Sequence, residues 1–385
     1  MAIVAAGVIT PLGPDLDAFW SALCAGRDGI TPIEAFPVGD LRVGRAGEIK
    51  KVPWPGEPPP ARGRAAALVL AAAEDLLART GALTADPARV AVVLGTALGG
   101  VGELERALDG ARGPRAPADA LYDSPAHALA RRLGAAGPVM TVSTACASGA
   151  TALGLGADLL AADAADLVVA GGYDALCRFV MRGFDALRSL TRERVRPFDR
   201  RRSGLLLGEA AALVLLAREA DAGPAPLGRL LGHASSSDGR HVAAPDPEGR
   251  GLEHAVRGAL TAAGVVPGDI DFVSAHGTAT PLNDPIETAV IKRVLGSRAG
   301  AVPVNSIKGA LGHTMGAAAT LEAIMCLLAG RDGVVPCTLG HEEPDPACDL
   351  DYVPGRARAC RPRLSLSTSL GFGGCNAALV LEARV

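Results

Sequence analysis

The chain has 385 residues, of which 49% are hydrophobic, 21% charged and 3% aromatic, and its formal net charge is -3. This composition is typical of a globular protein of two or three domain-sized units and excludes a disordered chain, and the charge argues against nucleic acid as a partner. No stretch of about 18 uncharged apolar residues occurs and no basic segment precedes the first apolar run, so we expect neither a membrane span nor a signal peptide.

Apolar runs that predict strands alternate along the chain with Ala/Leu patterns that predict helices. In chain order, the predicted strands are 2–9, 90–95, 139–143, 166–171, 211–217, 270–275, 302–305, 364–369 and 377–382. The predicted helices are 16–25, 64–80, 147–162, 251–264, 285–295 and 316–330. This alternation predicts an α/β fold with largely parallel, buried sheets. Residues 218–226, rich in Pro, Gly and Asp, are the predicted joint between two halves, 1–220 and 221–385.

One of the eight cysteines lies where a predicted strand turns into a helix of small residues, in Thr141-Val-Ser-Thr-Ala-Cys146-Ala-Ser-Gly149. Unpaired N–H groups and the dipole at a helix N-terminus lower the pKa of a thiol, and they can also hold an oxyanion. The segment alone leaves two interpretations open, an activated nucleophile or a small buried core residue. The other cysteines lack this setting and show no metal-ligand spacing, which predicts free thiols in a reducing cytoplasm and no metal site.

Two histidines and a lysine lie on glycine-flanked turns after predicted strands. His276 ends one strand and precedes Thr278 and Thr280, whose hydroxyls suit a polar, amide-bearing ligand arm. Asp284 and Glu287 follow on one face of the next helix.

Lys308 and His313 lie together on the second of these turns, before a small-residue helix. Lys308 is expected to pair with Glu287 or to hold the hydrogen-bond partner of a histidine. Each residue alone is more often structural, but their company with Cys146 indicates a shared site. Near the C-terminal end of the chain, Phe372 lies in Gly371-Phe-Gly-Gly374, which predicts either a gate with a free N–H or a hairpin turn.

Together these motifs resemble those of the elongating β-ketoacyl-[acyl-carrier-protein] synthases of the thiolase-like superfamily. Thr144-Ala-Cys146-Ala-Ser, His276-Gly-Thr-Ala-Thr-Pro281, Lys308-Gly-Ala-Leu-Gly-His313 and the Gly-Phe-Gly-Gly turn occur in the order and spacing of that family. The second histidine differs from the initiating synthases, which use His and Asn, and from thiolases, which use a second cysteine. The resemblance implies two pseudo-symmetric halves in a layered αβαβα arrangement, with the cysteine in the first and the histidines and lysine in the second.

The resemblance also implies a reaction and a role for each residue. Cys146 takes an acyl chain as a thioester, and His276 and His313 hold the malonyl thioester and stabilise the enolate formed as carbon dioxide leaves. Lys308 orients this pair through Glu287. The implied activity is that of an acyltransferase that performs decarboxylative Claisen condensation in fatty-acid, polyketide or polyene synthesis.

Further roles follow from the same resemblance. The N–H groups of Cys146 and Phe372, beside Gly371, form the oxyanion hole, and the Phe372 ring gates the acyl pocket. Thr278 and Thr280 bind the phosphopantetheine arm, and Leu98 borders the acyl pocket. Near the tunnel, the predicted docking charges for an acidic acyl carrier protein are Arg62, Arg64, Arg188 and Arg192, although a solvated loop is the alternative for such a cluster.

The 4'-phosphopantetheine belongs to the carrier protein, so we expect no resident cofactor. A homodimer through the strand before Cys146 is implied, or a heterodimer with a Cys-less ketosynthase-like subunit.

The alternative function is that of such a non-condensing, chain-length-determining partner, and the presence of Cys146 speaks against it. A third possibility is an acyltransferase without decarboxylation or a thioester hydrolase. The presence of both histidines and the lysine speaks against it, because simple acyl transfer does not need them all. Chain length is not implied, because Arg202-Ser-Gly-Leu205, Gly208-Glu-Ala-Ala211 and a short 100–135 region depart from the family pattern.

Overall fold

Ten strands form one continuous mixed sheet in a computed structural model, which describes residues 1–53, 63–110 and 116–384. Five come from the first half of the chain and five from the second. The first five are β1 (Ala2–Ile9), β4 (Val90–Gly95), β5 (Val139–Val142), β6 (Leu167–Asp174) and β7 (Ala210–Ala217). The second five are β8 (Gly228–Ser237), β9 (Phe272–Ser274), β10 (Val304–Asn305), β13 (Leu364–Gly371) and β14 (Cys375–Ala383).

The two halves of the sheet repeat one topology. The strand order is β5-β4-β6-β7-β1 in the first half and β10-β9-β13-β14-β8 in the second, so the chain-order pattern 3-2-4-5-1 occurs twice. Strand directions repeat as well. In the first half β1 and β7 run antiparallel to both of their neighbours, and in the second half β8 and β14 do the same, whereas the other pairs are parallel. The halves join where Ala2 pairs with Arg229 and Ile3 with Gly228.

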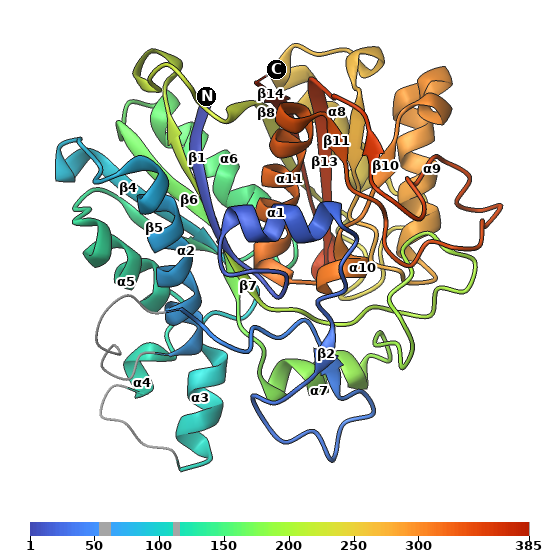
Figure 1. Cartoon of the computed structure of the whole chain (residues 1–385), viewed down its shortest axis with the longest axis horizontal. Helices are drawn as coiled ribbons and strands as arrows, with labels where there is room; N and C mark the ends of the chain where they lie inside the picture. The colour runs from blue at the N-terminus through green and yellow to red at the C-terminus, as the bar shows by residue number, and fades with distance from the viewer. Residues whose placement is uncertain (54–62, 111–115, 385) are drawn as a thin grey trace.

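Helices build the other layers (Figure 1). α6 (Ser148–Ala161) and α11 (Ala318–Asp332) lie between the two half-sheets, and α11 is buried along nearly its whole length. α2 (Arg64–Thr80) and α5 (Ser124–Leu133) cover the outer face of the first half, and α8 (Arg250–Ala263) and α9 (Asn283–Leu295) that of the second. The result is the αβαβα layering that the family resemblance implies.

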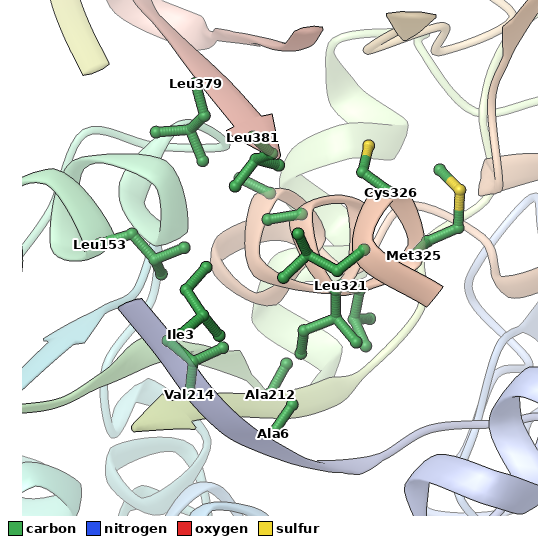
Figure 2. Packing of buried hydrophobic residues seen from close by; sticks show 14 of the residues in the cluster. Ile3, Ala6, Leu153, Ala212, Val214, Leu321, Met325, Cys326, Leu379 and Leu381 are labelled. Atoms are coloured by element: carbon green, nitrogen blue, oxygen red, sulfur yellow. The ribbon is translucent and has the colours of Figure 1, made fainter. Parts of the chain in front are cut away.

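The central layer carries the largest core cluster. Figure 2 shows Leu321 of α11 among Ile3 of β1, Val214 of β7 and Leu381 of β14, so side chains of both halves meet on one helix. Small residues bring α6 and α11 into close contact: a Cβ at Gly149 would lie 2.7 Å from the Gly316 carbonyl oxygen. This close approach holds the start of α6, which follows Cys146, against the segment that follows His313.

Shorter elements complete the chain. They are α1 (Leu16–Cys24), α3 (Val101–Leu108), α4 (Ala116–Asp119), α7 (Arg178–Ala186), α10 (Lys308–Leu311), β2 (Thr31–Pro32), β3 (Arg45–Ala46), β11 (Val334–Val335) and β12 (Arg358–Ala359). Single-turn 3-10 helices at Met315–Ala317 and Phe372–Gly374 lie beside the site described below. Among the described helices, none is both long enough and apolar enough to cross a membrane.

All nine predicted strands and all six predicted helices occur within a few residues of their predicted bounds. The sequence did not predict β8, whose glycines and Ser235–Ser237 do not resemble an apolar strand, although β8 pairs with both β14 and β1. It also did not predict α3, α5 and α7, which are short and partly polar. The predicted joint, 218–226, lies between β7 and β8, and the division into halves at residue 220 stays a prediction.

Candidate active site

Cys146 lies in a tight turn, residues 143–147, between β5 and α6, and is only 5% exposed. Ala145 has φ 51°, a left-handed conformation that is strained for a residue with a Cβ. The Ser148 hydroxyl braces the turn, because it donates to the Ala145 carbonyl at 2.6 Å and accepts the Thr144 N–H at 2.9 Å. This bracing stabilises the strained backbone next to Cys146.

His276 and His313 lie beside this thiol, as predicted. His276 follows β9, and His313 follows α10. Their ring centroids are 5.2 Å apart and the rings meet edge to face at 81°. The Cys146 sulfur and one nitrogen of each imidazole lie within 4.8 Å of one another, and all three residues are buried. The fold therefore brings together three groups that are separated by up to 167 residues in sequence.

Both imidazoles are neutral. Burial holds the pKa of His276 and of His313 well below the usual 6.5, and the positive charge of Lys308 lowers both values further. The Met315 N–H donates to Nδ1 of His313 at 3.1 Å, so the proton of this neutral ring lies on Nε2. Within the described residues this Nε2 has no hydrogen-bond partner. A buried N–H donor without a partner suits an anionic oxygen of a substrate.

The predicted pair between Lys308 and Glu287 is wrong. The Lys308 ammonium group lies 2.5 Å from the Glu322 carboxylate and 2.5 Å from the His276 carbonyl oxygen. Both side chains of the ion pair are fully buried, and burial raises the pKa of Glu322 to about 7 despite the nearby lysine. Glu322 is the single charged residue among the first twelve of α11, and that isolated charge in an apolar helix is the feature that could have identified it.

Glu287 instead supports the backbone around His276. Its carboxylate accepts the N–H groups of His276 and Gly277 at 2.7 and 2.8 Å and the Thr368 hydroxyl at 2.7 Å. Lys308 and Glu287 thus both contact the main chain of His276, one at its carbonyl group and the other at its N–H. Each orients the histidine without contacting its ring.

The thiol of Cys146 does not have the lowered pKa that the sequence predicts. Burial raises its pKa to about 12, although Lys308 and a hydrogen bond from the Phe372 N–H act in the opposite direction. The reason is that desolvation of the thiolate outweighs the favourable field at the start of α6. The free enzyme therefore carries a neutral thiol at pH 7.

The Gly371–Gly374 segment packs against the Cys146 turn. A Cβ at Gly371 would lie 2.8 Å from the Thr144 carbonyl oxygen and 3.1 Å from the Cys146 nitrogen, so only glycine fits without movement. The Phe372 ring stacks on Phe184 of α7, with centroids 5.4 Å apart. The segment connects two antiparallel strands, β13 and β14, as the hairpin interpretation predicts, and it also places an N–H at Cys146.

A cavity of about 410 Å³ is lined by Cys146, both histidines and Phe372. Thr278 and Thr280 line it as well, and their hydroxyls lie 3.0 Å apart. Leu98 does not line this cavity but packs with the cluster around α7, and its place beside the acyl pocket stays a prediction. His241 lies at the cavity as well. Its Nδ1 accepts the N–H groups of Ala243 and Ala244, which leaves Nε2 as the donor.

The predicted docking arginines have different surroundings. Arg64 is wrongly assigned, because its guanidinium is paired with the fully buried Glu209 and bonded to the Ile49 carbonyl oxygen. Arg62 lies outside the described residues. Arg188 and Arg192 are exposed, Arg188 lines the cavity, and neither has an ion-pair partner in the part of the chain that the structure describes. Most arginines of the stretch 194–202 instead pair with acids, chiefly Glu342.

Comparisons with known proteins cover the whole chain. Two family models match, described as the N-terminal domain (residues 1–222) and the C-terminal domain (residues 227–342) of β-ketoacyl synthase. The chain is 38% identical to the tetracenomycin polyketide synthase ketoacyl synthase alpha subunit of Streptomyces glaucescens, over 98% of this chain and 96% of that one. It is 34% identical to 3-oxoacyl-[acyl-carrier-protein] synthase 2 of a Synechocystis species, over 98% and 96%. A solved structure of the ishigamide ketosynthase/chain length factor superimposes with a TM-score of 0.94 at 33% identity, over 100% and 99%.

Proposed function

The chain belongs to the β-ketoacyl synthase family with a thiolase-like fold, and we propose that Cys146, His276 and His313 carry the chemistry of its condensation. The enzyme is an acyltransferase that joins a cysteine-bound acyl chain to a malonyl unit by decarboxylative Claisen condensation. One observation carries the proposed roles: a buried thiol lies within 4.8 Å of two imidazole nitrogens, and both rings are neutral N–H donors.

In the first half-reaction, the Cys146 sulfur attacks the carbonyl carbon of a carrier-bound acyl thioester. The N–H groups of Cys146 and Phe372 hold the developing oxyanion. The bond between the carbonyl carbon and the carrier sulfur breaks, and the thiol proton of Cys146 ends on the departing carrier thiol. Because the pKa of Cys146 is raised to about 12, this proton leaves as the sulfur attacks rather than beforehand.

In the second half-reaction, the malonyl carboxylate leaves as carbon dioxide, and its electron pair passes to an enolate. The imidazole N–H groups of His276 and His313 stabilise the enolate oxygen, and loss of one such donor typically costs about 100- to 1,000-fold in rate. The carbanion then forms the new carbon–carbon bond at the Cys146 thioester, and the carbon–sulfur bond breaks. The thiolate of Cys146 takes a proton from solvent, which replaces the proton lost to the carrier thiol and restores the free enzyme.

The partner is an acyl carrier protein, whose phosphopantetheine arm would pass Thr278 and Thr280 to reach Cys146. Exposed Arg188 and Arg192 would attract its acidic surface. We expect a second ketosynthase-like subunit to pair along β5, the edge strand of the sheet, with a homodimer as the proposed form and a Cys-less partner as the alternative. The proposed location is the cytoplasm.

We propose that catalysis needs no metal or resident cofactor, because decarboxylation itself supplies the carbanion. Thiolate and imidazole are nevertheless ligands that Zn²⁺ prefers, and three of them converge here. Dialysis against a chelator should leave the rate of condensation unchanged, and added Zn²⁺ should inhibit by capturing Cys146. A rate that falls on chelation and returns with metal contradicts this proposal.

A non-condensing partner subunit is the alternative function, and the two functions differ in whether Cys146 becomes acylated. We would incubate the wild type, Cys146→Ala and His313→Ala with a panel of acyl carrier thioesters, then with malonyl carrier, and measure intact masses. Cys375→Ala is the control, since Cys375 is a free, partly exposed thiol outside the proposed machinery. Acylation lost only in Cys146→Ala, with β-ketoacyl product lost also in His313→Ala, is the expected result. No acylation of the wild type by any chain would favour the partner subunit.

A further inference from the structure

We propose that Asp174 is a positioning residue: its carboxylate joins the turn that orients His313 to the turn that carries Cys146. The inference rests on the proposed function of these two residues and names a third residue on which both depend. Asp174 is the last residue of β6, and its side chain is fully buried. It contacts neither the cavity nor either reacting side chain directly.

Four donors converge on this one carboxylate. Oδ1 accepts the Thr96 hydroxyl at 2.7 Å and the Leu98 N–H at 3.0 Å. Oδ2 accepts the Ala97 N–H at 2.9 Å and the Gly316 N–H at 2.7 Å. No cation pairs with Asp174 among the described residues, so its charge is held by hydrogen bonds alone.

The bond from Gly316 orients the His313 turn, residues 313–317. Met315 has φ 51°, a strained left-handed conformation, and its N–H is the donor that holds Nδ1 of His313. The next N–H in the chain, that of Gly316, is held by Asp174. A Cβ at Gly316 would lie 2.7 Å from Thr96 Cα and 2.8 Å from Asp174 Oδ2, so the two segments are in close contact. Asp174 therefore holds the peptide directly after the one whose N–H determines which nitrogen of His313 carries the proton.

The bond from Thr96 reaches the Cys146 turn. The Thr96 carbonyl oxygen lies 3.2 Å from the Ser148 hydroxyl and shares its single proton with the nearer Ala145 carbonyl oxygen, while the hydroxyl oxygen accepts the Thr144 N–H. The Thr96 N–H donates to the carbonyl oxygen of Val142, the last residue of β5. Thr96 is thus attached to both ends of the turn and, through its hydroxyl, to Asp174.

The chemistry requires a carboxylate at this position. A side-chain amide would bring two N–H donors toward four donors and would leave buried groups unpaired. The negative charge also opposes ionisation of Cys146, since Asp174 is one of the groups that raise the pKa of that thiol. A group that opposes ionisation of the nucleophile and yet accepts four hydrogen bonds from two neighbouring segments fits a positioning role.

The test compares Asp174→Asn with Asp75→Asn in the full-length enzyme. Asp75 also accepts two backbone N–H groups, those of Val8 and Leu16, but far along the chain from the site. Long-range ¹⁵N–¹H spectra of histidine-labelled protein report the tautomer of His313, and mass spectrometry reports acylation of Cys146 and decarboxylation of malonyl carrier separately. We expect Asp174→Asn to lose the single Nε2–H tautomer and to slow decarboxylation by about tenfold to 100-fold. Asp75→Asn should lower the melting temperature without either effect.

A second variant protects the test if Asp174→Asn does not fold. Thr96→Val keeps the bond to Gly316 and loses the hydroxyl, so it should slow acylation of Cys146 while the His313 tautomer stays unchanged. An unchanged tautomer and unchanged half-reactions in Asp174→Asn, or unchanged acylation in Thr96→Val, overturns the proposal. A changed tautomer in a protein whose wild type never condenses would leave the positioning role intact and reject the proposed function instead.

Discussion

At the scale of single residues, the site is defined by which buried groups carry charge. The thiol and both imidazoles are neutral at pH 7, and the positive charge of Lys308 beside them is paired with Glu322. A neutral imidazole already carries the one N–H that can donate to an enolate oxygen, so neither ring has to change its protonation state. The buried Lys308–Glu322 ion pair lies next to the histidines, and the charge of Lys308 helps to keep both rings neutral.

The raised pKa of Cys146 predicts how its reactivity depends on pH. Because only the thiolate reacts with an alkylating agent, the rate of Cys146 alkylation should rise about tenfold per pH unit from pH 7 to pH 10, without a plateau. Peptide mass spectrometry after timed iodoacetamide labelling measures this rate, and Cys146→Ala identifies the peptide. A plateau near pH 7 would show an already ionised thiol and contradict the prediction.

The Lys308–Glu322 pair predicts a stability effect. Lys308→Met should lower the free energy of unfolding by about 3–5 kcal/mol, because it leaves a buried carboxylate without its partner. The loss should be smaller at pH 6 than at pH 8, because burial already raises the pKa of Glu322 to about 7 beside the lysine and the unpaired carboxyl takes up a proton still more readily as the pH falls. Urea unfolding of Lys308→Met, with and without Glu322→Leu, measures both effects.

The matched control for that experiment is Lys308→Met with Glu287→Leu. Glu322→Leu should restore most of the lost stability, whereas Glu287→Leu should add to the loss, because Glu287 holds three other donors. Recovery with Glu287→Leu would support the pairing expected from the sequence.

At the scale of elements, the contact between α6 and the start of α11 aligns the two halves of the site. Gly149 makes this contact possible, since a Cβ there would lie 2.6 Å from Thr320 Oγ1 and 2.7 Å from the Gly316 carbonyl oxygen. The same contact connects the helix after Cys146 with the segment after His313. A small change in helix spacing therefore changes the distance between thiol and imidazole.

Gly149→Ala should destabilise the protein by about 1–3 kcal/mol through overpacking and should slow condensation more than malonyl-carrier binding. Gly183→Ala is the control, because Gly183 also lies in a helix, α7, and nothing lies within 4 Å of its added Cβ. Thermal unfolding and steady-state kinetics of both variants test this. Equal behaviour of the two variants would argue against tight α6–α11 packing.

At the scale of the whole molecule, each half contributes a different part of the reaction. The first half supplies the nucleophile after the end of β5, and the second supplies His276, Lys308, His313 and the Phe372 N–H. β5 pairs only with β4 among the described strands, and Met140 on it is 36% exposed. An apolar edge strand that leads directly into the nucleophile turn suits a subunit interface.

Met140→Glu should therefore convert the proposed dimer into monomers at micromolar concentration and reduce activity, since β5 leads directly into the Cys146 turn. Sedimentation equilibrium measures the association. Val266→Glu, which places the same charge at a more exposed apolar position on the second half, should leave the association unchanged. If Met140→Glu associates as the wild type does, β5 is not the interface.

Much of this protein is determined locally. Cys146, His276, Lys308 and His313 each follow a predicted strand at a turn of small residues, and the apolar periods that predict these strands are visible without any tertiary contact. That is why the strands, most of the helices and the α/β class could be predicted from the pattern, whereas the layered arrangement came from the family resemblance and the roles of these four residues stay a proposal. β8 and α7 could not be predicted in this way. β8 becomes a strand by pairing with β14, and α7 becomes a helix by packing Val180 and Met181 into a buried cluster.

Only the tertiary structure decided which buried charges meet. The partner of Lys308 is Glu322 rather than Glu287, because α11 passes beneath the His276 strand; Arg64 faces Glu209, 145 residues away, instead of a carrier protein. The thiol of Cys146 is neutral because the surrounding layers exclude water, and the role of Asp174 depends on two turns that only the folded chain brings together. Local pattern determines which chemical groups stand at the ends of strands, whereas burial and long-range packing determine their charge, their partners and their orientation.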